Sequence, residues 1–261
     1  MEIAGGETAV VIAAGAGRRM RESAGGARPK PATLVVGIPL VVRVLWRLAE
    51  TGVRRAVVVT GCRAGEVRAT AWAGRPPGLE IVFVQNDAWE RQNGLSVLAA
   101  RDAVGGAPFV LTMADHLYSP LVIEALRSAS ERDVDVALAV DRRLGEIADI
   151  VDATRVRTDP RGRIREIGKV LPAYDAVDAG VFLCTPALFD AIEGEREARG
   201  DCSLSDGVAR VARGGRALAV DIPDEAWWQD VDNAADLDRA ERLVLRHEAA
   251  RVYGASTALV A

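Results

Sequence analysis

The sequence predicts an α/β protein with a Rossmann-like mixed sheet, mostly parallel, with helices on both faces and a small inserted β-hairpin lobe. Short apolar runs alternate with helical patterns through the first half of the chain, which is typical of parallel strands joined by crossover helices. These runs are continuously apolar, as strands buried on both faces require. In the second half, the turn sequence Asp159-Pro-Arg-Gly162 predicts the hairpin.

The first half of the chain alternates between two patterns. Runs such as TAVVIA, RAVVVT and FVLTM are β-branched or apolar throughout and predict strands, whereas apolar residues spaced three or four apart predict helices. Strands are therefore predicted at 8–13, 55–60, 80–84, 109–113 and 134–140, and helices at 40–50, 64–73, 94–103 and about 120–130.

The second half is less regular, and its helices begin after capping residues such as Ser203 or Ser205. Nothing in the sequence marks a domain boundary, so we expect a single domain over 1–261 with the hairpin lobe at about 150–176. The predicted elements are hairpin strands at 154–158 and 163–167, strands at 177–184 and 216–221, and helices at 186–193, 204–213 and 233–250.

Composition excludes several classes of protein. Apolar residues make up 49% of the chain, which is enough for a full core and excludes wholesale disorder. The net charge of −4 argues against a nucleic-acid-binding face, which needs clustered basic residues. No apolar run approaches the roughly 18 residues of a membrane span, and we see no signal peptide.

The cysteines indicate a compartment but no metal site. Cys62, Cys184 and Cys202 form an odd, widely spaced trio, which matches neither a disulfide framework nor a zinc pattern. We therefore expect a cytoplasmic protein. The sequence leaves open whether the chain forms a homodimer.

Two scarce residue types point to sites. Lysine occurs only at positions 30 and 169 among 33 basic residues, and an ammonium is a compact point charge that a guanidinium does not replace. Side-chain amides are also rare, and four of them fall between Gln85 and Asn93. Amides both donate and accept hydrogen bonds, as recognition of a nucleobase edge requires, although loops also favour Asn.

A glycine loop follows the first predicted strand. In Ala13-Ala-Gly-Ala-Gly-Arg-Arg-Met20, backbone N–H groups are able to approach a polyphosphate closely. The loop lacks the Gly-Lys-Ser/Thr of a Walker A motif, and Met20 stands where a dinucleotide fingerprint has its third glycine. Arg18, Arg19 and Lys30 favour anion binding over an ordinary strand-to-helix turn.

Two carboxylates far apart in the chain suit a hard cation. Asp115 follows a buried strand, and Asp232 lies in Gln229-Asp-Val-Asp232. Mg²⁺ is typically bound by one or two carboxylates together with substrate phosphates. The alternative for each aspartate is a helix cap, with Asn233 competing for that role. We assign no role to His116.

Lys169 ends the predicted hairpin, where it is placed to hold a second phosphate; the alternative is a solvated surface lysine.

Together, AAGAGRRM with PKP, NGLS, MADHLY, DAVDAG and QDVD resemble the nucleotidyltransferase superfamily that couples an NTP to a phosphorylated small molecule. The resemblance covers about residues 8 to 243. Within the superfamily, MADHLYS, IGKVLPAYDAVDAGVF and SLSDGV followed by WQDVD are most similar to CTP:inositol-1-phosphate cytidylyltransferases.

The resemblance implies an enzyme that transfers CMP from CTP to a small phosphorylated acceptor, inositol 1-phosphate first, by attack of an acceptor phosphate oxygen on the α-phosphorus with release of pyrophosphate. It implies that Arg18, Lys30 and Lys169 carry the reaction, that Asp115 and Asp232 hold Mg²⁺, and that Lys169, Asp178 and Gly180 bind the acceptor. The implied nucleotide-binding residues are Ala13, Ala14, Gly15, Ala16, Gly17, Gln85, Asn93, Gly94 and Ser96.

Two alternatives remain open. The same chemistry could serve phosphocholine or a small phosphonate, and a cationic head would need acidic or aromatic lining such as Trp227, Trp228 or Tyr174. A non-catalytic nucleotide-binding domain is the alternative from another class. Such a domain would require an acidic residue for the cofactor ribose roughly 20 residues beyond the glycines. Residues 33–43 contain no acidic residue.

Overall fold

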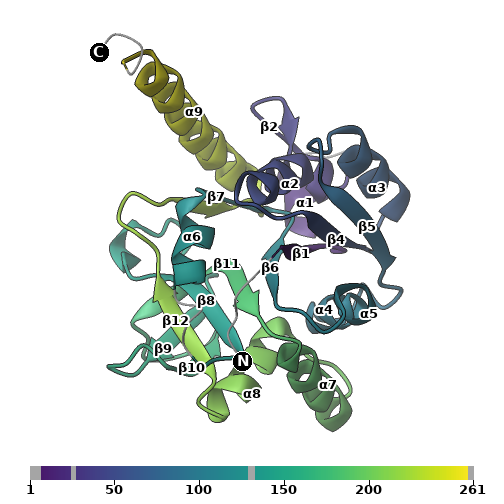
Figure 1. Ribbon diagram of the computed structural model, residues 1–261, viewed down its shortest axis with the longest axis vertical. Helices are drawn as coiled ribbons and strands as arrows, with labels where there is room; N and C mark the ends of the chain where they lie inside the picture. The colour runs from purple at the N-terminus through teal and green to yellow at the C-terminus, as the bar shows by residue number, and fades with distance from the viewer. Residues whose placement is uncertain (1–6, 25–27, 129–132, 258–261) are drawn as a thin grey trace.

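The computed structural model describes residues 7–24, 28–128 and 133–257 (Figure 1). Its centre is one nine-stranded mixed sheet, as predicted. The parallel part is built around β1 (Thr8–Ala13), which pairs with β4 (Arg55–Thr60) on one side and β6 (Phe109–Met113) on the other. β5 (Glu80–Gln85) extends this part beyond β4. The carboxyl ends of these strands therefore meet at one edge of the sheet, where ligands bind in such folds.

The other part of the sheet turns antiparallel at β11 (Ala176–Cys184), which pairs with β6 and β8 (Val136–Asp141). β12 (Ala217–Asp221) runs parallel to β8. The predicted hairpin is present as β9 (Arg155–Thr158) and β10 (Ile164–Gly168). Because β9 also pairs with the first residues of β11, the hairpin extends the main sheet.

Helices cover both faces of the sheet, and alternate residues of each strand face alternate layers. Along β1, for example, Val11 packs in the core of one face and Val10 in the core of the other. One face is covered by α2 (Leu40–Glu50), α3 (Ala64–Ala73), α6 (Leu121–Ser128) and the start of α9 (Ala234–Thr257). The other is covered by α4 (Gly94–Ala99), α5 (Arg101–Val104), α7 (Ala187–Arg199) and α8 (Leu204–Arg213).

Short elements complete the fold and matter for the site. They are α1 (Arg18–Ala24), the 3-10 turns η1 (Lys30–Ala32) and η2 (Leu144–Glu146), the hairpin β2 (Leu34–Val35) and β3 (Ile38–Pro39), and the ribbon formed by β7 (His116–Tyr118) and β13 (Trp228–Asp230). Most span only two or three residues, too few to show a period of either kind, and the sequence patterns did not predict them.

Several element boundaries differ from the predictions. The helix expected over 94–103 divides at Ala100 into α4 and α5. The helix expected at 186–193 continues to Arg199, because the charged segment after Ile192 consists mostly of good helix formers. The helix expected to reach about residue 130 is described to Ser128, and its last two predicted residues lie outside the described ranges.

The last helix, α9, extends away from the body of the protein (Figure 1). Over the ranges that the structure describes, no helix combines the length and apolar character needed to cross a bilayer.

Candidate active site

The glycine loop and Lys30 form one wall of a small cavity of about 230 Å³. Gly17 has a φ of +61°, and a Cβ at this position would lie only 2.5 Å from the Cβ of Lys30. A residue other than glycine would thus strain the backbone and displace the lysine stem. The cavity is also lined by Gly15, Arg18, Arg19, Asp115 and Asp232.

The two aspartates predicted to hold a cation come together, although 117 residues separate them, because β7 pairs with β13. His116 pairs with Asp230 in this ribbon, and the Val231 N–H donates to the carbonyl oxygen of Asp115 at 3.0 Å. Lys30 Nζ lies 2.5 Å from Asp115 Oδ2 and also pairs with Asp232. One ammonium group therefore bridges both carboxylates.

Neither aspartate serves as a helix cap, which was the alternative for both. At the start of α9, the side chain of Asn233 accepts from the Asp236 N–H at 3.1 Å, and the Asp236 carboxylate accepts from the Asn233 N–H at 3.1 Å. This reciprocal pair satisfies the helix start and leaves the Asp232 carboxylate for the cavity. The carboxylate of Asp115 is engaged by Lys30 and His116.

Burial and charge fix the protonation states around this bridge. Burial opposes ionisation of Asp115, but the charges of Lys30 and His116 outweigh it and hold the pKa of Asp115 well below its usual range. Burial also opposes charge on Lys30, yet the two carboxylates raise the pKa of Lys30. For His116, the hydrogen bond and charge of Asp115 overcome burial and raise the pKa to about 9. All three groups are charged at neutral pH.

The bridge belongs to a longer row of alternating charges. Arg19 lies 2.5 Å from Asp232 and also pairs with Asp152, and Asp152 in turn lies 2.9 Å from Lys169 Nζ. Burial disfavours ionisation of Asp152, but hydrogen bonds from Lys169 and Arg19 lower its pKa. Positive and negative groups therefore alternate from Lys169 through the aspartates to Lys30.

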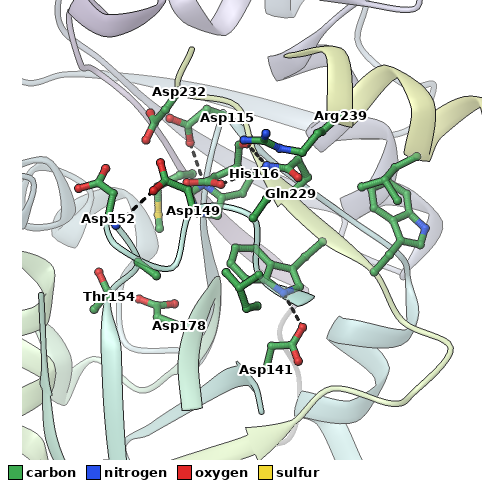
Figure 2. Close-up of a pocket in the computed structure, with 18 of the residues that line it drawn as sticks. Asp115, His116, Asp141, Asp149, Asp152, Thr154, Asp178, Gln229, Asp232 and Arg239 are labelled. Atoms are coloured by element: carbon green, nitrogen blue, oxygen red, sulfur yellow. Dashed lines mark hydrogen bonds and ion pairs between the residues drawn. The ribbon is translucent and has the colours of Figure 1, made fainter. Parts of the chain in front are cut away.

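A larger cavity of about 560 Å³ begins at the same aspartate pair and extends to α9. Figure 2 shows Asp115 and Asp232 at one end of it and Asp141 at the other. Its remaining acidic lining residues are Glu146, Asp149, Asp152, Asp178 and Asp230, and its cationic lining residues other than His116 are Arg143, Lys169, Arg239, Arg242 and Arg246. Such a lining offers acceptors for hydroxyl groups and cations for a phosphate.

Part of the cavity wall is already occupied by internal contacts. Asp141 accepts hydrogen bonds from Arg143 and from the Trp228 indole at 3.0 Å. Trp227 stacks on His247 with ring centroids 5.0 Å apart. Tyr174, the third aromatic residue considered for a cationic head, is covered by the Arg155 guanidinium and does not line either cavity. Of the three aromatic residues, only Trp227 and Trp228 therefore line the cavity, and one face of Trp227 is covered by His247.

The two residues predicted from the DAVDAG strand lie in different surroundings. Asp178 lines the larger cavity and accepts from the Gly180 N–H at 2.7 Å. Burial raises the pKa of Asp178 to about 6, partly offset by that hydrogen bond. Gly180 is buried and faces the ring of His116.

The predicted base-recognition residues are less closely gathered. Asn93 lines the larger cavity, and its side-chain oxygen accepts from the Leu204 N–H at 2.9 Å. Ser96 is buried and accepts from the Asn86 amide. Gln85 accepts from Arg68 at the end of β5. Neither Gln85 nor Ser96 lines either of these two cavities, and Gly94 packs tightly against the Cys202 carbonyl oxygen.

The aspartate pair fits a divalent cation that is shared with a substrate. Mg²⁺ prefers oxygen ligands, and Asp115 and Asp232 both reach the same ammonium, so one small ion can contact both carboxylates. In the described parts of the chain, no cluster of three or more His, Cys, Asp or Glu side chains forms a complete metal site. Phosphate oxygens and water would therefore supply the other ligands.

Sequence reasoning missed the roles of Asp152 and His116, and it assigned Arg19 only to the loop charge. Asp152 had no distinctive neighbours in the sequence, and its partners are far away in the chain. His116 carried one signal, its position directly after a predicted metal ligand, since such ligands are commonly oriented by a neighbouring hydrogen-bonding group.

A glycine loop, two lysines and a carboxylate pair at the carboxyl edge of an α/β sheet define a protein that handles nucleoside triphosphates. Residues 9–166 match the family described as the MobA-like NTP transferase domain, and the chain belongs to this family of nucleotidyltransferases.

Several known proteins are similar to this chain over most of its length. The chain is 40% identical, over 92% of its length, to a bifunctional IPC transferase and DIPP synthase of Rubrobacter xylanophilus, of which it covers 52%. It is 35% identical, over 89% of its length, to a CMP-5'-(3-aminopropyl)phosphonate synthase of Streptomyces rubellomurinus, of which it covers 38%. The inositol-1-phosphate CTP transferase of T. maritima superposes with a TM-score of 0.78 at 28% identity, covering 90% of this chain and 93% of that one. The chain spans about half the length, or less, of the curated relatives it matches first.

Proposed function

We propose that this protein transfers CMP from CTP to inositol 1-phosphate, with release of pyrophosphate. One observation carries the proposal: Asp115 and Asp232 border both cavities. A cation held there would lie between a triphosphate in the glycine loop and an acceptor in the larger cavity. The two relatives whose names include IPC transferase or inositol-1-phosphate CTP transferase support this acceptor.

The chemistry joins two polyanions. An oxygen of the acceptor phosphate forms a bond to the α-phosphorus, and the bond from that phosphorus to the bridging oxygen of the β-phosphate breaks. The acceptor oxygen is already ionised at neutral pH, so the protein needs no strong general base. The obstacle is repulsion, roughly 4 kcal/mol for two unit charges 4 Å apart at an effective dielectric constant near 20.

The chain's own cations offset this repulsion. Lys30, Arg18 and Arg19 line the glycine-loop cavity, and we assign them to the triphosphate. Lys169 lines the larger cavity, and we assign it to the acceptor phosphate. A bound Mg²⁺ would neutralise charge on the transferring phosphoryl group. The fixed protein groups hold the reacting atoms in line, which supplies much of the rate in phosphoryl transfer.

The larger cavity favours a polyol over a quaternary ammonium. Asp178 and Asp149 line it and offer acceptors for hydroxyl groups. An aromatic cage for choline needs several open ring faces. One face of Trp227 is stacked on His247 and Tyr174 lies outside the cavity, so Trp228 is the one tryptophan of the pair without a stacked ring among the described residues.

A small aminoalkyl phosphonate is the second candidate acceptor. The carboxylates that suit hydroxyl groups would also pair with a primary ammonium, and the relative from Streptomyces rubellomurinus is named for such a product. Membership of an NTP transferase family favours either enzyme over a non-catalytic nucleotide-binding domain.

Pyrophosphate release tests the proposal directly. Each of the four NTPs is combined with inositol 1-phosphate, phosphocholine or 3-aminopropylphosphonate, with Mg²⁺ or with EDTA. We expect release with CTP and inositol 1-phosphate only when Mg²⁺ is present. Faster release with the aminophosphonate would transfer the assignment to the second candidate. No release with any pair would overturn the proposal.

A further inference from the structure

His116 contacts Asp115, the aspartate that borders both cavities, although sequence reasoning gave it no role. It is the first residue of β7, its side chain is 17% exposed, and it lines the larger cavity. Its Nδ1 lies 2.8 Å from Oδ1 of Asp115. Since Lys30 contacts Oδ2 of the same carboxylate, both oxygens of Asp115 are held.

Gly180 makes room for the imidazole. Between Asp178 and Phe182, β11 shifts its register against β8, so the strand bulges at this point. A Cβ on Gly180 would lie 2.0 Å from Cδ2 of His116 and 2.5 Å from its Nε2. The ring therefore occupies the space that any side chain at position 180 would need.

We propose that His116 is a positioning residue that orients Asp115 as a ligand for the divalent cation, and that position 180 is glycine because a side chain there would displace the imidazole. This inference rests on the proposed function, because the cation is the one that the transfer reaction would use. It gives Gly180 a role in the metal site that is separate from the acceptor binding expected from the sequence.

The geometry explains why the ring matters. A carboxylate on a single stem rotates about its terminal bond, and a cation binds best when that rotation is already restricted. Lys30 restrains one oxygen of Asp115, but this ammonium also bridges to Asp232 and must yield space when an ion binds. The imidazole restrains the other oxygen, Oδ1. It is packed against the bulge of β11 and does not depend on the ion's position.

Mn²⁺ binding separates this role from catalysis. The free Mn²⁺ signal in electron paramagnetic resonance gives the dissociation constant, measured with the non-hydrolysable analogue α,β-methylene-CTP and without acceptor. Loss of a group that orients a metal ligand typically weakens metal binding 10- to 100-fold. We expect His116→Ala to weaken Mn²⁺ binding at least about tenfold and His116→Asn, which keeps an N–H near the position of Nδ1, by less than about threefold.

The glycine is tested in two backgrounds. Gly180→Ala should weaken Mn²⁺ binding about as much as His116→Ala, whereas adding Gly180→Ala to His116→Ala should change it less than about twofold, because the ring is already gone. Gly200→Ala is the matched control, since Gly200 also has a positive φ, +79° against +76°, but nothing lies within 4 Å of its added Cβ. Gly200→Ala should leave Mn²⁺ binding unchanged.

Three results would overturn the inference. They are Mn²⁺ binding by His116→Ala within about twofold of the wild type, His116→Asn as weak as His116→Ala, and an equal loss from Gly180→Ala in both backgrounds, which would indicate backbone strain alone. Thermal unfolding of each variant confirms that it is folded. A wild-type protein that binds no Mn²⁺ with the analogue, yet is folded, would instead contradict the proposed function.

Discussion

The two lysines of this chain sit in opposite surroundings. Lys30 packs its stem against Gly17, its side chain is only 10% exposed, and its ammonium bridges Asp115 and Asp232. The side chain of Lys169 is 56% exposed and pairs with Asp152 at 2.9 Å. The half of the site that we propose for the nucleotide thus has a buried cation held by the fold, while the half that we propose for the acceptor has an exposed one.

This difference indicates how the two halves work. Ion pairs removed from water are strong only when geometry is fixed, whereas exposed pairs contribute little and are screened by salt. Before a cation binds, the Lys30 bridge is therefore part of the folded framework. Lys169 is held weakly enough to exchange Asp152 for a substrate phosphate at little cost.

The largest expected effect is on the bridge itself. Asp115→Asn keeps the shape of the side chain but removes the charge that would hold the cation, so turnover with CTP and Mg²⁺ should fall by roughly 10³-fold. Initial rates of pyrophosphate release measure it. Asp221→Asn, which removes an exposed carboxylate paired with Arg142 outside both site cavities, should stay within about twofold of the wild type. Near-normal turnover of Asp115→Asn would show that Asp115 is not a ligand of the cation.

The second prediction compares the two lysines by the free energy of unfolding that each contributes. Lys30→Ala leaves two partly buried carboxylates without their shared cation and should lower the free energy of unfolding by about 3 kcal/mol. Lys169→Ala breaks an exposed pair and should cost less than about 1 kcal/mol. Urea denaturation at neutral pH measures both. Equal losses would show that burial does not distinguish the two ion pairs.

A smaller effect concerns binding of the acceptor. If Lys169 holds the acceptor phosphate as we propose, Lys169→Ala would remove a charge-assisted hydrogen bond, so the KM for inositol 1-phosphate should rise roughly 10- to 100-fold. The KM for CTP should change less than about threefold, because Lys169 does not line the glycine-loop cavity. Lys169→Arg, which retains the charge, should recover part of the loss. A rise in the KM for CTP as large as that for the acceptor would contradict the division into halves.

The sequence predicted the long buried strands of the sheet but not the short ribbon that forms the site. The strands and helices of the parallel part were predictable because runs such as 55–60 are apolar throughout and buried on both faces. The β7–β13 ribbon was not, because its strands have three residues each. Yet this ribbon brings Asp115 and Asp232 together. Their residue type and their places at loop ends suggested a shared cation, but no spacing pattern predicted the ribbon that joins them.

Within the site, residues next to a local signal were the ones found. Lys30 and Lys169 stood out by rarity, and Asp115 by its place after a strand. Asp152 bridges Arg19 and Lys169, but its partners are 133 and 17 residues away. Long-range pairing leaves no trace in the spacing of a single sequence, and that is why the row of alternating charges emerged only from the structure.

The smallest effect concerns Asp178, a buried acid of the acceptor half. Its folded pKa of about 6 lies above the unfolded value near 3.8, so the native state binds a proton more readily than the unfolded chain. Its contribution to stability is fully present below about pH 4 and is lost as the pH rises through about 6. Asp178→Asn should therefore become more stable than the wild type as the pH rises from 4 to 7, by on the order of 2 kcal/mol.

A matched acid with the opposite shift makes this prediction sharper. Asp135 pairs with Arg216 at 2.5 Å, and hydrogen bonds from Arg216 and Thr185 lower its pKa against the effect of burial. Its stabilisation is present above the unfolded pKa and is lost as the pH falls through the lower folded value, so Asp135→Asn should be less stable than the wild type at pH 7 and approach it in acid. Urea denaturation of both variants at pH 7 should give differences from the wild type of opposite sign. Between pH 4 and 7 only the Asp178→Asn difference should change, because the Asp135 contribution is lost only below the unfolded pKa of 3.8. If Asp178→Asn instead loses stability relative to the wild type between pH 4 and 7, then His116 and the cavity accommodate the ionised carboxylate, and the cavity is already suited to a charged Asp178 before substrate binds.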